Sequence, residues 1–478
     1  MKSTSSSESR TSTEVDLVLE LSAGKGRQSA LELALRDAIR AGRLREATKL
    51  PSSRGLAQEL GMARSTVSGA YSQLVAAGYL ETRQGAGTWV APNAASRPSE
   101  EHEEPPPQEP RFDLRPHLPD LSRFPRRAWV RALGTALARA SDSVFAPGDP
   151  RGRIELRRSL TEYLARSRGV LTSPRQLLIC NGFCQGFRLL CEVLRERGAR
   201  RIALEDPCVF LYPPIARAAG LEVVPVPVDP QGLIVERLAE TCADAVLVTP
   251  AHQFPLGATL APRRRAALIA WADANGALVI EDDYDGEFRY DRQPVAALQG
   301  LEPDLVAYAG TASKTLAPGL RLAWLALPPS LVDAAAERRE VAERYAPVLD
   351  QLALAELIDR GDFDRHVRSM RLHYRRRRDR MLAEIGRSTP QFQPSGIAAG
   401  LHFVLELPRG LTEAEIVAAA QERSIGLFGV ETFRHGPSEY DEALVIGYGA
   451  PPEHNFEASI SALAALLVEA TGRAERSA

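Results

Sequence analysis

The stretch ALVIEDDYDGEFRY, residues 277–290, says most about the fold of this chain of 478 residues. It opens with a short apolar run, which is typical of a strand buried on both faces of a sheet. The run leads directly into Asp282, Asp283, Tyr284, Asp285 and Glu287. Acids at a strand end can bind a metal, but no histidine stands near them in the sequence, so we expect no metal site. A carboxylate that pairs with a protonated pyridine nitrogen is the alternative.

A lysine stands in the polar loop GTASKTLAPGLR, residues 310–321, which follows the apolar run LVAYAG. Lys314 lies among Thr311 and Ser313, and Arg321 follows seven positions later. Loops at the carboxyl ends of parallel strands are where open α/β sheets bind ligands. Hydroxyls and an arginine suit a phosphate, and an amine beside it suits an imine bond to an aldehyde. This loop therefore predicts a phosphate site that contains an amine.

Apolar runs alternate with helical stretches from residue 113 onward. The runs are QLLICN, RIALED, AVLVTP, ALVIEDD, LVAYAG and RLAWLAL, with helices such as RRRAALIAWADANG between them. This alternation predicts an α/β domain with a mostly parallel sheet covered by helices on both faces. The run YRRRRDR, residues 374–380, is interpreted as a solvated helix face, with a second DNA-contacting patch as the alternative.

Two further loops carry polar groups at strand ends. TPAHQFPLG, residues 249–257, contains His252 and Gln253. QLLICNGFCQGFRLL, residues 176–190, has the order strand, glycine, helix, with Gly182, Phe183 and Cys184 at the turn. Backbone amides at such a helix N-terminus suit a phosphate. For His252 and Gln253, a contact with a cofactor oxygen and a purely structural turn both remain open.

The composition is that of an ordinary globular protein, with 44% hydrophobic and 25% charged residues and a net charge of −2 that indicates no partner. The five cysteines form no CxxC pair and no zinc spacing, which favours reduced cysteines in a cytosolic protein. We expect a cytoplasmic protein, because neither a signal peptide nor an apolar run of about 18 residues is present. Residues 1–24 predict a disordered tail, and residues 92–112, rich in proline and glutamate, predict a linker.

The segment between tail and linker, residues 25–91, is basic, with ten Lys and Arg against five Asp and Glu. Leu31, Leu35 and Ile39 recur at the spacing of one helical face. LPSSRGLAQELG and MARSTVSGAYSQLVAAGYL then predict two helices joined by a tight turn at Gly61, which is a helix-turn-helix. YLETRQGAGTWVA predicts a β-hairpin that forms a wing.

This segment resembles the winged helix-turn-helix domain of GntR-type bacterial regulators, and the resemblance rests on residues 50–90. It implies binding to double-stranded DNA. The residues that it places on DNA are Arg54, Arg64, Ser65, Thr66 and Ser68, with Gly85 in the wing. Arginines pair with phosphates or with guanine, and hydroxyls bond to phosphate.

The four loops described above, together with GDPRGRIELRRSL at residues 148–160, resemble fold-type I aminotransferases that use pyridoxal 5'-phosphate (PLP). With the winged helix in front, the chain resembles the MocR-type subgroup of GntR regulators. This implies an aminotransferase-like domain at 113–470 with a small C-terminal subdomain. Lys314 would bond covalently to PLP, and Tyr284 would bond to the phenolic oxygen. Asp282 would pair with the pyridine nitrogen, with Asp283 as the alternative. The phosphate would contact Arg321, Thr311, Ser313, Gly182, Phe183 and Cys184.

Three positions depart from a working aminotransferase. Phe254 stands where an asparagine usually contacts the cofactor oxygen. Val209, with Phe210 next to it, stands where an aromatic ring usually stacks on the cofactor. Val445, in LVIGYGA, stands where an arginine usually binds the substrate carboxylate, and its loss costs affinity and orientation. Arg434, in ETFRHG, is the candidate substitute for effector binding.

These features favour a dimeric transcription regulator whose aminotransferase-like domain senses PLP, or an amine or amino acid that reacts with it. Binding of the small-molecule effector would shift the relative placement of the two winged helices of a homodimer. The alternative is a functional aminotransferase with an accessory DNA-binding domain. A third hypothesis is a DNA-binding protein with an empty enzyme fold, and the joint presence of Lys314, Asp282, Tyr284 and Arg321 argues against it.

Overall fold

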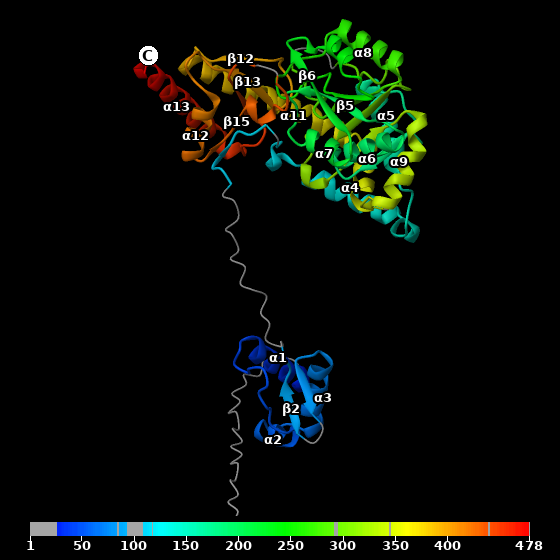
Figure 1. Cartoon of the computed structure of the whole chain (residues 1–478), viewed down its shortest axis with the longest axis vertical. Helices are drawn as coiled ribbons and strands as arrows, with labels where there is room; N and C mark the ends of the chain where they lie inside the picture. Colours follow the sequence, from blue (N-terminus) through cyan, green and yellow to red (C-terminus); the bar gives the residue numbers. More distant parts are fainter. Residues whose placement is uncertain are drawn as a thin grey trace, which may run out of the picture. The chain divides into compact units, whose positions relative to one another are not determined.

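The structure is a computed structural model that describes residues 26–83, 86–92, 109–116, 118–290, 295–343, 346–437 and 440–477 (Figure 1). The chain divides into two compact units, Met1–Gln108 and Glu109–Ala478. The predicted tail and residues 93–108 of the predicted linker lie outside the described residues. The boundaries 24, 91 and 112 therefore stay predictions.

The first unit is a winged helix-turn-helix, as the sequence predicts. Its elements are α1 (Arg27–Arg40), α2 (Ser53–Glu59), α3 (Arg64–Ala76), β1 (Leu80–Arg83) and β2 (Gly87–Val90). Leu31, Leu35 and Ile39 of α1 are buried against Val67 and Leu74 of α3 and neighbouring apolar side chains. The side chain of Ser52 caps α2 by accepting a hydrogen bond from the Gly55 amide. The antiparallel hairpin β1–β2 forms the base of the wing.

The second unit is built on an eight-stranded sheet with the order β4-β11-β10-β9-β8-β5-β6-β7. The strands are β4 (Leu177–Cys180), β5 (Arg201–Asp206), β6 (Glu222–Asp229), β7 (Gly232–Leu233), β8 (Ala245–Val248), β9 (Leu278–Asp283), β10 (Val306–Thr311) and β11 (Ala323–Ala326). All six predicted apolar runs form strands of this sheet. Strands β10, β9, β8, β5 and β6 pair in parallel, whereas β11 and β7 pair antiparallel with their neighbours.

Helices cover both faces of this sheet. They are α4 (Arg126–Arg139), α5 (Ile154–Arg168), α6 (Phe183–Glu196), α7 (Tyr212–Ala218), α8 (Pro262–Asn275), α9 (Pro329–Ala342) and α10 (Val348–Asp359). Alternate side chains of a strand point to opposite faces, so Leu247 packs with α6, α7 and α9, whereas Val246 packs with α8. In Figure 1, α8 lies above strands β5 and β6, and α6 and α7 lie below them. Apolar residues of α4, α5 and α10 form a third buried cluster.

The C-terminal subdomain has its own antiparallel sheet with the order β12-β13-β16-β15. Its strands are β12 (Gln393–Ser395), β13 (His402–Glu406), β15 (Phe428–Gly429) and β16 (Ala443–Gly447), and its helices are α11 (Asp362–Ser388), α12 (Glu413–Glu422) and α13 (Glu453–Ser477). A separate pair, β3 (Phe112–Asp113) and β14 (Ile425–Gly426), runs parallel. The first residues of the second unit are thus joined to its C-terminal subdomain.

The run YRRRRDR lies on α11, but the expectation of a fully solvated face is wrong. Tyr374 and Arg377 are buried. Arg377 Nη1 donates to the backbone oxygens of Tyr448, Gly449 and Pro451. The arginine therefore supports the turn that follows β16. Among the described residues, no helix is both long and apolar enough to cross a membrane.

Candidate cofactor site and DNA-binding face

The carboxyl ends of β9 and β10 bring the predicted acid and the predicted lysine to one edge of the sheet. The two strands are parallel, and Asp282 lies opposite Ala309 in their register. Lys314 follows β10 by three residues, and its pKa is lowered by burial, against the opposing effects of Asp285 and Asp282. A lowered pKa keeps more of the amine neutral, which is the form that attacks an aldehyde.

Asp282 is a buried carboxyl with one strong partner. Tyr212 Oη donates to Asp282 Oδ2 at 2.6 Å. Burial raises the pKa of Asp282 to about 7, with smaller effects from Tyr212, Asp283, Asp285 and Lys314. A carboxyl so placed gains from a nearby cation, such as a protonated pyridine nitrogen.

Asp283 differs from Asp282 because its charge is already paired. Arg168 donates to both of its oxygens, with Nε to Oδ2 at 2.6 Å and Nη2 to Oδ1 at 2.9 Å. Tyr308 Oη also donates to Oδ2, at 2.8 Å. The ion pair is buried, because the side chains of Arg168 and Asp283 are 1% and 2% exposed. The geometry thus favours Asp282 over Asp283 as the group for a cofactor nitrogen.

Tyr284 lies beside the predicted histidine of the TPAHQFPLG loop. Tyr284 Oη is 3.1 Å from His252 Nδ1, and the same nitrogen is 2.8 Å from Asp285 Oδ2. Burial, followed by the charges of Asp285 and Asp282, raises the pKa of Tyr284 well above its usual value. The phenol is therefore a neutral hydrogen-bond donor at physiological pH.

The side chain of Gln253 forms hydrogen bonds to the backbone of its own turn and of Pro207. Its Nε2 donates to the backbone oxygens of Pro207 and Phe254, at 2.8 Å and 2.7 Å, and its Oε1 accepts from the Leu256 amide at 3.0 Å. These bonds fix the loop that carries His252. A direct contact of Gln253 with a cofactor stays a prediction.

The phosphate side of the site is the start of α6. Gly182 precedes this helix with φ of 85°, and a Cβ there would lie 3.1 Å from the guanidinium of Arg321. Arg321 Nη2 donates to the Asn181 backbone oxygen at 2.7 Å. Phe183 and Cys184 form the first turn of α6, where backbone amides and the helix dipole favour an anion.

Two hydroxyls complete this side. Thr311 Oγ1 donates to Ser313 Oγ at 2.9 Å, and Thr311 is buried at the end of β10. Thr311 is the last residue of this strand, and Ser313 stands between it and Lys314. Burial, followed by the charge of Asp282, raises the pKa of Cys184, which argues for a packed thiol and against a reactive one.

The three departures from an aminotransferase share one apolar environment. Val445 on β16 is fully buried in a cluster with Phe254, Phe433 and neighbouring apolar side chains. Val209 packs against the same cluster, whereas Phe210 is half exposed. An apolar wall therefore occupies the place where a carboxylate-binding arginine is expected.

Arg434, the candidate substitute, follows Phe433 of that cluster. Its Nη1 donates to Glu431 Oε2 at 2.5 Å. Its side chain is partly buried, and its Nε has no hydrogen-bond partner in the described part of the chain. A role for Arg434 in effector binding stays a prediction.

Of the predicted DNA contacts, Arg54 lies on α2, and the others that the structure describes lie in the first turns of α3. Arg54, Arg64 and Ser65 are exposed, whereas Thr66 and Ser68 are half-buried. Gly85 lies outside the described residues. At the base of the wing, Arg83 and Lys49 stack on Trp89, with 5.0 Å and 5.6 Å to the ring centroid.

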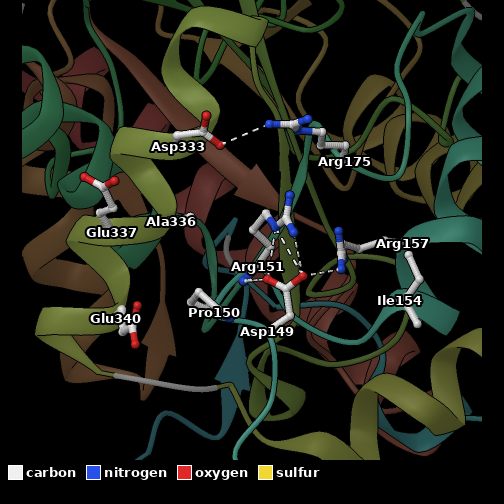
Figure 2. A pocket seen from close by; sticks show the side chains of 10 residues that line it. All are labelled: Asp149, Pro150, Arg151, Ile154, Arg157, Arg175, Asp333, Ala336, Glu337 and Glu340. Atoms are coloured by element: carbon white, nitrogen blue, oxygen red, sulfur yellow. Dashed lines mark hydrogen bonds and ion pairs between the residues drawn. The ribbon is translucent and has the colours of Figure 1, made fainter.

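The sequence did not reveal several groups that shape the cofactor site. Tyr212 starts α7 within an apolar segment, and Arg168 ends α5, so neither belongs to a motif. His402 arrives from β13, and its ring lies 5.1 Å from that of His252. Only the tertiary fold brings these side chains together. The motif GDPRGRIELRRSL forms hydrogen bonds among its own residues. Asp149 accepts from Arg151 and Arg157 beside a cavity of about 650 Å³ (Figure 2).

Comparisons with known proteins agree with both units. The family model for aminotransferase class I and II matches residues 118–438, and that for the gntR family of bacterial regulatory proteins matches residues 27–90. The probable rhizopine catabolism regulatory protein MocR of Rhizobium meliloti is 30% identical over 95% of this chain and 97% of its own length. The chain belongs to the MocR-type subgroup of the GntR family.

This MocR-type chain has further relatives with the same organisation. The HTH-type pyridoxine biosynthesis transcriptional regulator PdxR of Corynebacterium glutamicum is 32% identical over 88% of this chain and 91% of its own length. Among solved structures, an archaeal alanine:glyoxylate aminotransferase has a TM-score of 0.69 at 24% identity, covering 75% of this chain and 91% of that one. The second unit thus has the fold-type I aminotransferase fold, which belongs to a PLP-dependent family.

The residues of this MocR-type chain fit PLP. The start of α6 and Arg321 supply donors for the phosphate. A larger residue at Gly182 would be strained by its positive φ and would crowd the Arg321 guanidinium. A buried carboxyl with a raised pKa and an amine with a lowered pKa complete the donor set. PLP bound here would supply an aldehyde and an electron-withdrawing ring.

Proposed function

We propose that this protein is a PLP-dependent, DNA-binding transcription regulator that senses PLP, or an amine or amino acid that reacts with it. The observation that carries the proposal is the contrast between two neighbouring sets of residues. Lys314, Asp282, Tyr284 and Arg321 keep the chemistry that holds the cofactor, while Val445 sits in an apolar cluster where a substrate arginine is expected. Loss of a bidentate arginine weakens substrate orientation more than cofactor binding.

We infer one role for each of the chain's own residues around the site, and the geometry supports these roles. Lys314 would hold PLP covalently, Asp282 would keep the pyridine nitrogen protonated, and Tyr284 would donate to the phenolic oxygen. Arg321 and the α6 amides fix the phosphate. An effector that changes these contacts shifts the balance between conformations of the second unit, and through it the DNA-binding units.

We further propose a cytoplasmic homodimer with two winged helices that read two half-sites. Support comes from large apolar side chains on the surface of the single chain, such as Phe145 and Val341, which are 64% and 80% exposed. Sedimentation of the purified protein tests the assembly, and a monomer at micromolar concentration contradicts it.

The first test of the function is an absorbance spectrum recorded while DNA binding is followed. We expect a band from bound PLP, a change of that band with one class of amine, and a parallel change in affinity for operator DNA. A functional aminotransferase is the alternative: steady turnover of an amino donor and a keto acid at about 1 per second or faster would favour it. An intact band with no effect of PLP or amines on DNA binding contradicts sensing.

The DNA-binding face yields a separate prediction. Arg64→Ala is expected to weaken operator binding by about 5- to 150-fold, because one arginine contact contributes about 1–3 kcal/mol. Arg64 is exposed at the start of α3. A phosphate contact would also lower the dependence of affinity on salt by about one unit of slope. Arg217→Ala, an exposed arginine of the second unit, is the control and should bind like the unchanged protein.

A further inference from the structure

His252 shares one ring nitrogen between two neighbours. Nδ1 lies 2.8 Å from Asp285 Oδ2 and 3.1 Å from Tyr284 Oη. His252 and Asp285 are 4% and 3% exposed, so water does not compete for these bonds. The three side chains come from two different loops, at the ends of β8 and β9.

The charge of Asp285 determines whether His252 Nδ1 donates or accepts in these contacts. An ionised Asp285 only accepts hydrogen bonds, so the short contact requires a proton on His252 Nδ1. That N–H can then point to both Asp285 Oδ2 and Tyr284 Oη. Because Nδ1 donates, it cannot accept from the phenol. The Tyr284 hydroxyl also hydrogen-bonds to the side chain of Asp285, whose carboxylate is engaged by His252. When PLP is bound, its phenolic oxygen would be the competing acceptor for the Tyr284 hydrogen.

The C-terminal subdomain encloses this group. A Cβ on Gly400 would lie 2.4 Å from Asp285 Oδ2 and 2.5 Å from His252 Cε1, so the glycine backbone packs directly on the pair. Tyr290 and Tyr448 both donate to the Gly400 backbone oxygen, at 2.5 Å and 2.7 Å. These contacts hold the histidine ring in one orientation.

Resting on the proposed function, we propose that His252, fixed by Asp285, is a positioning residue that makes Tyr284 donate its hydrogen bond to the phenolic oxygen of PLP. The place of the usual asparagine is taken by Phe254, which packs edge-on against Tyr284 with 5.9 Å between ring centroids. Phe254 has no polar group to orient the phenol. His252 supplies this orientation, and its own ring stacks on that of Tyr284 with 6.1 Å between centroids.

Other charged groups face this site and belong in any account of its pH dependence. Asp282 and Glu205 act on Tyr284. His402 faces His252 and Lys314, and burial, with these two neighbours, lowers the pKa of His402 well below its usual value. Asp285 also hydrogen-bonds to the side chain of Tyr284, as His252 does, so Asp285 belongs to the group that sets the orientation of the phenol.

The test is a pH titration of the absorbance of bound PLP, which requires no turnover. A donor to the phenolic oxygen favours its negative charge and so lowers the pH midpoint. His252→Leu and Tyr284→Phe should each raise the midpoint by about one unit, because a hydrogen bond to a charged group contributes about 1.5–3 kcal/mol. The double variant should match Tyr284→Phe alone, because His252 acts only through Tyr284. His252→Asn, whose amide nitrogen replaces Nδ1, should restore the midpoint.

The outcomes separate this inference from the function on which it rests. No PLP band in the unchanged protein rejects the proposed function, and the inference with it. A band whose midpoint is unchanged in His252→Leu, shifts that add in the double variant, or failure of His252→Asn to restore the midpoint would each overturn the inference alone. His252→Gln, whose amide cannot reach the Nδ1 position, replaces the leucine variant if that protein does not fold, and should shift the midpoint equally.

Discussion

Lys314→Ala protein is expected to lose covalently bound PLP and every response of DNA binding to PLP. The chain has only four lysines, Lys2, Lys25, Lys49 and Lys314, so one lysine serves all 429 residues from 50 to 478. Without its amine no other group in the second unit can form an imine with the aldehyde. We expect PLP affinity to fall by at least about 100-fold, which corresponds to about 2.7 kcal/mol.

Borohydride reduction followed by peptide mass measurement checks this result. The unchanged protein should carry one reduced pyridoxyl group, on the peptide that contains Lys314, and the variant none in the second unit. Lys49→Ala is the matched control, because Lys49 stacks on Trp89 in the first unit and should leave PLP binding intact. A Lys314→Ala protein whose DNA binding still responds fully to PLP would falsify the sensing role of this lysine.

Asp282→Asn and Asp283→Asn are expected to have opposite effects, although the two residues are adjacent. Asp283→Asn leaves Arg168 buried without its counter-charge, which costs about 3–5 kcal/mol of unfolding free energy. Asp282→Asn removes a carboxyl whose folded-state pKa is raised from 3.8 to about 7, so the PLP-free protein should become more stable at pH 8, by roughly 1–4 kcal/mol.

The sign of the pH dependence follows from that raised pKa. Above pH 7 the Asp282 carboxyl is charged in both the folded and the unfolded state, and the folded state bears the full cost of the buried charge. Below about pH 4 it is protonated in both states and the cost disappears. The advantage of Asp282→Asn should therefore shrink as the pH falls from 7 to 4. Denaturant unfolding of PLP-free protein at pH 8 and pH 5 measures it.

The same variant should bind PLP about 10- to 150-fold more weakly, because it loses the charged partner of the pyridine nitrogen. Absorbance titration measures this affinity. If instead Asp283→Asn folds normally but loses PLP binding, while Asp282→Asn keeps it, the assignment of the two aspartates is reversed. Such a result would leave the fold and the lysine assignment untouched.

The sequence predicted the sheet and the winged helix because their patterns are local. Apolar runs such as LVAYAG predicted strands that end at the loops of the candidate cofactor site. The spacing of apolar residues and the turn at Gly61 predicted the helix-turn-helix. The lysine loop and the acid loop were also predictable, since parallel strands end at one edge of a sheet. The direction of β11 was not, because an antiparallel strand has the same apolar pattern as a parallel one.

Pairings between distant segments lay beyond the sequence. Nothing in YRRRRDR marks Arg377 as the one arginine that turns inward to the backbone after β16. The choice between Asp282 and Asp283 depended on Arg168, which lies 115 residues from Asp283. The same holds for Gly400, whose close packing on His252 is a property of the assembled fold. Each of these contacts is a choice of partner, which composition and periodicity do not encode.

The strand pair β3–β14 joins the first described residues of the second unit to its C-terminal subdomain. The Arg111 amide donates to Ser424 Oγ at 2.9 Å, and Asn455 Nδ2 donates to the Arg111 backbone oxygen at 2.8 Å. Hydrogen bonds and strand pairing therefore fix the start of the second unit to this subdomain. Gly400 of the same subdomain packs directly on His252. The C-terminal subdomain therefore contacts both the candidate cofactor site and the first described residues of the second unit. We expect a shift of this subdomain at the site to displace residues 111–113 with it, because the strand pair and its hydrogen bonds hold them together.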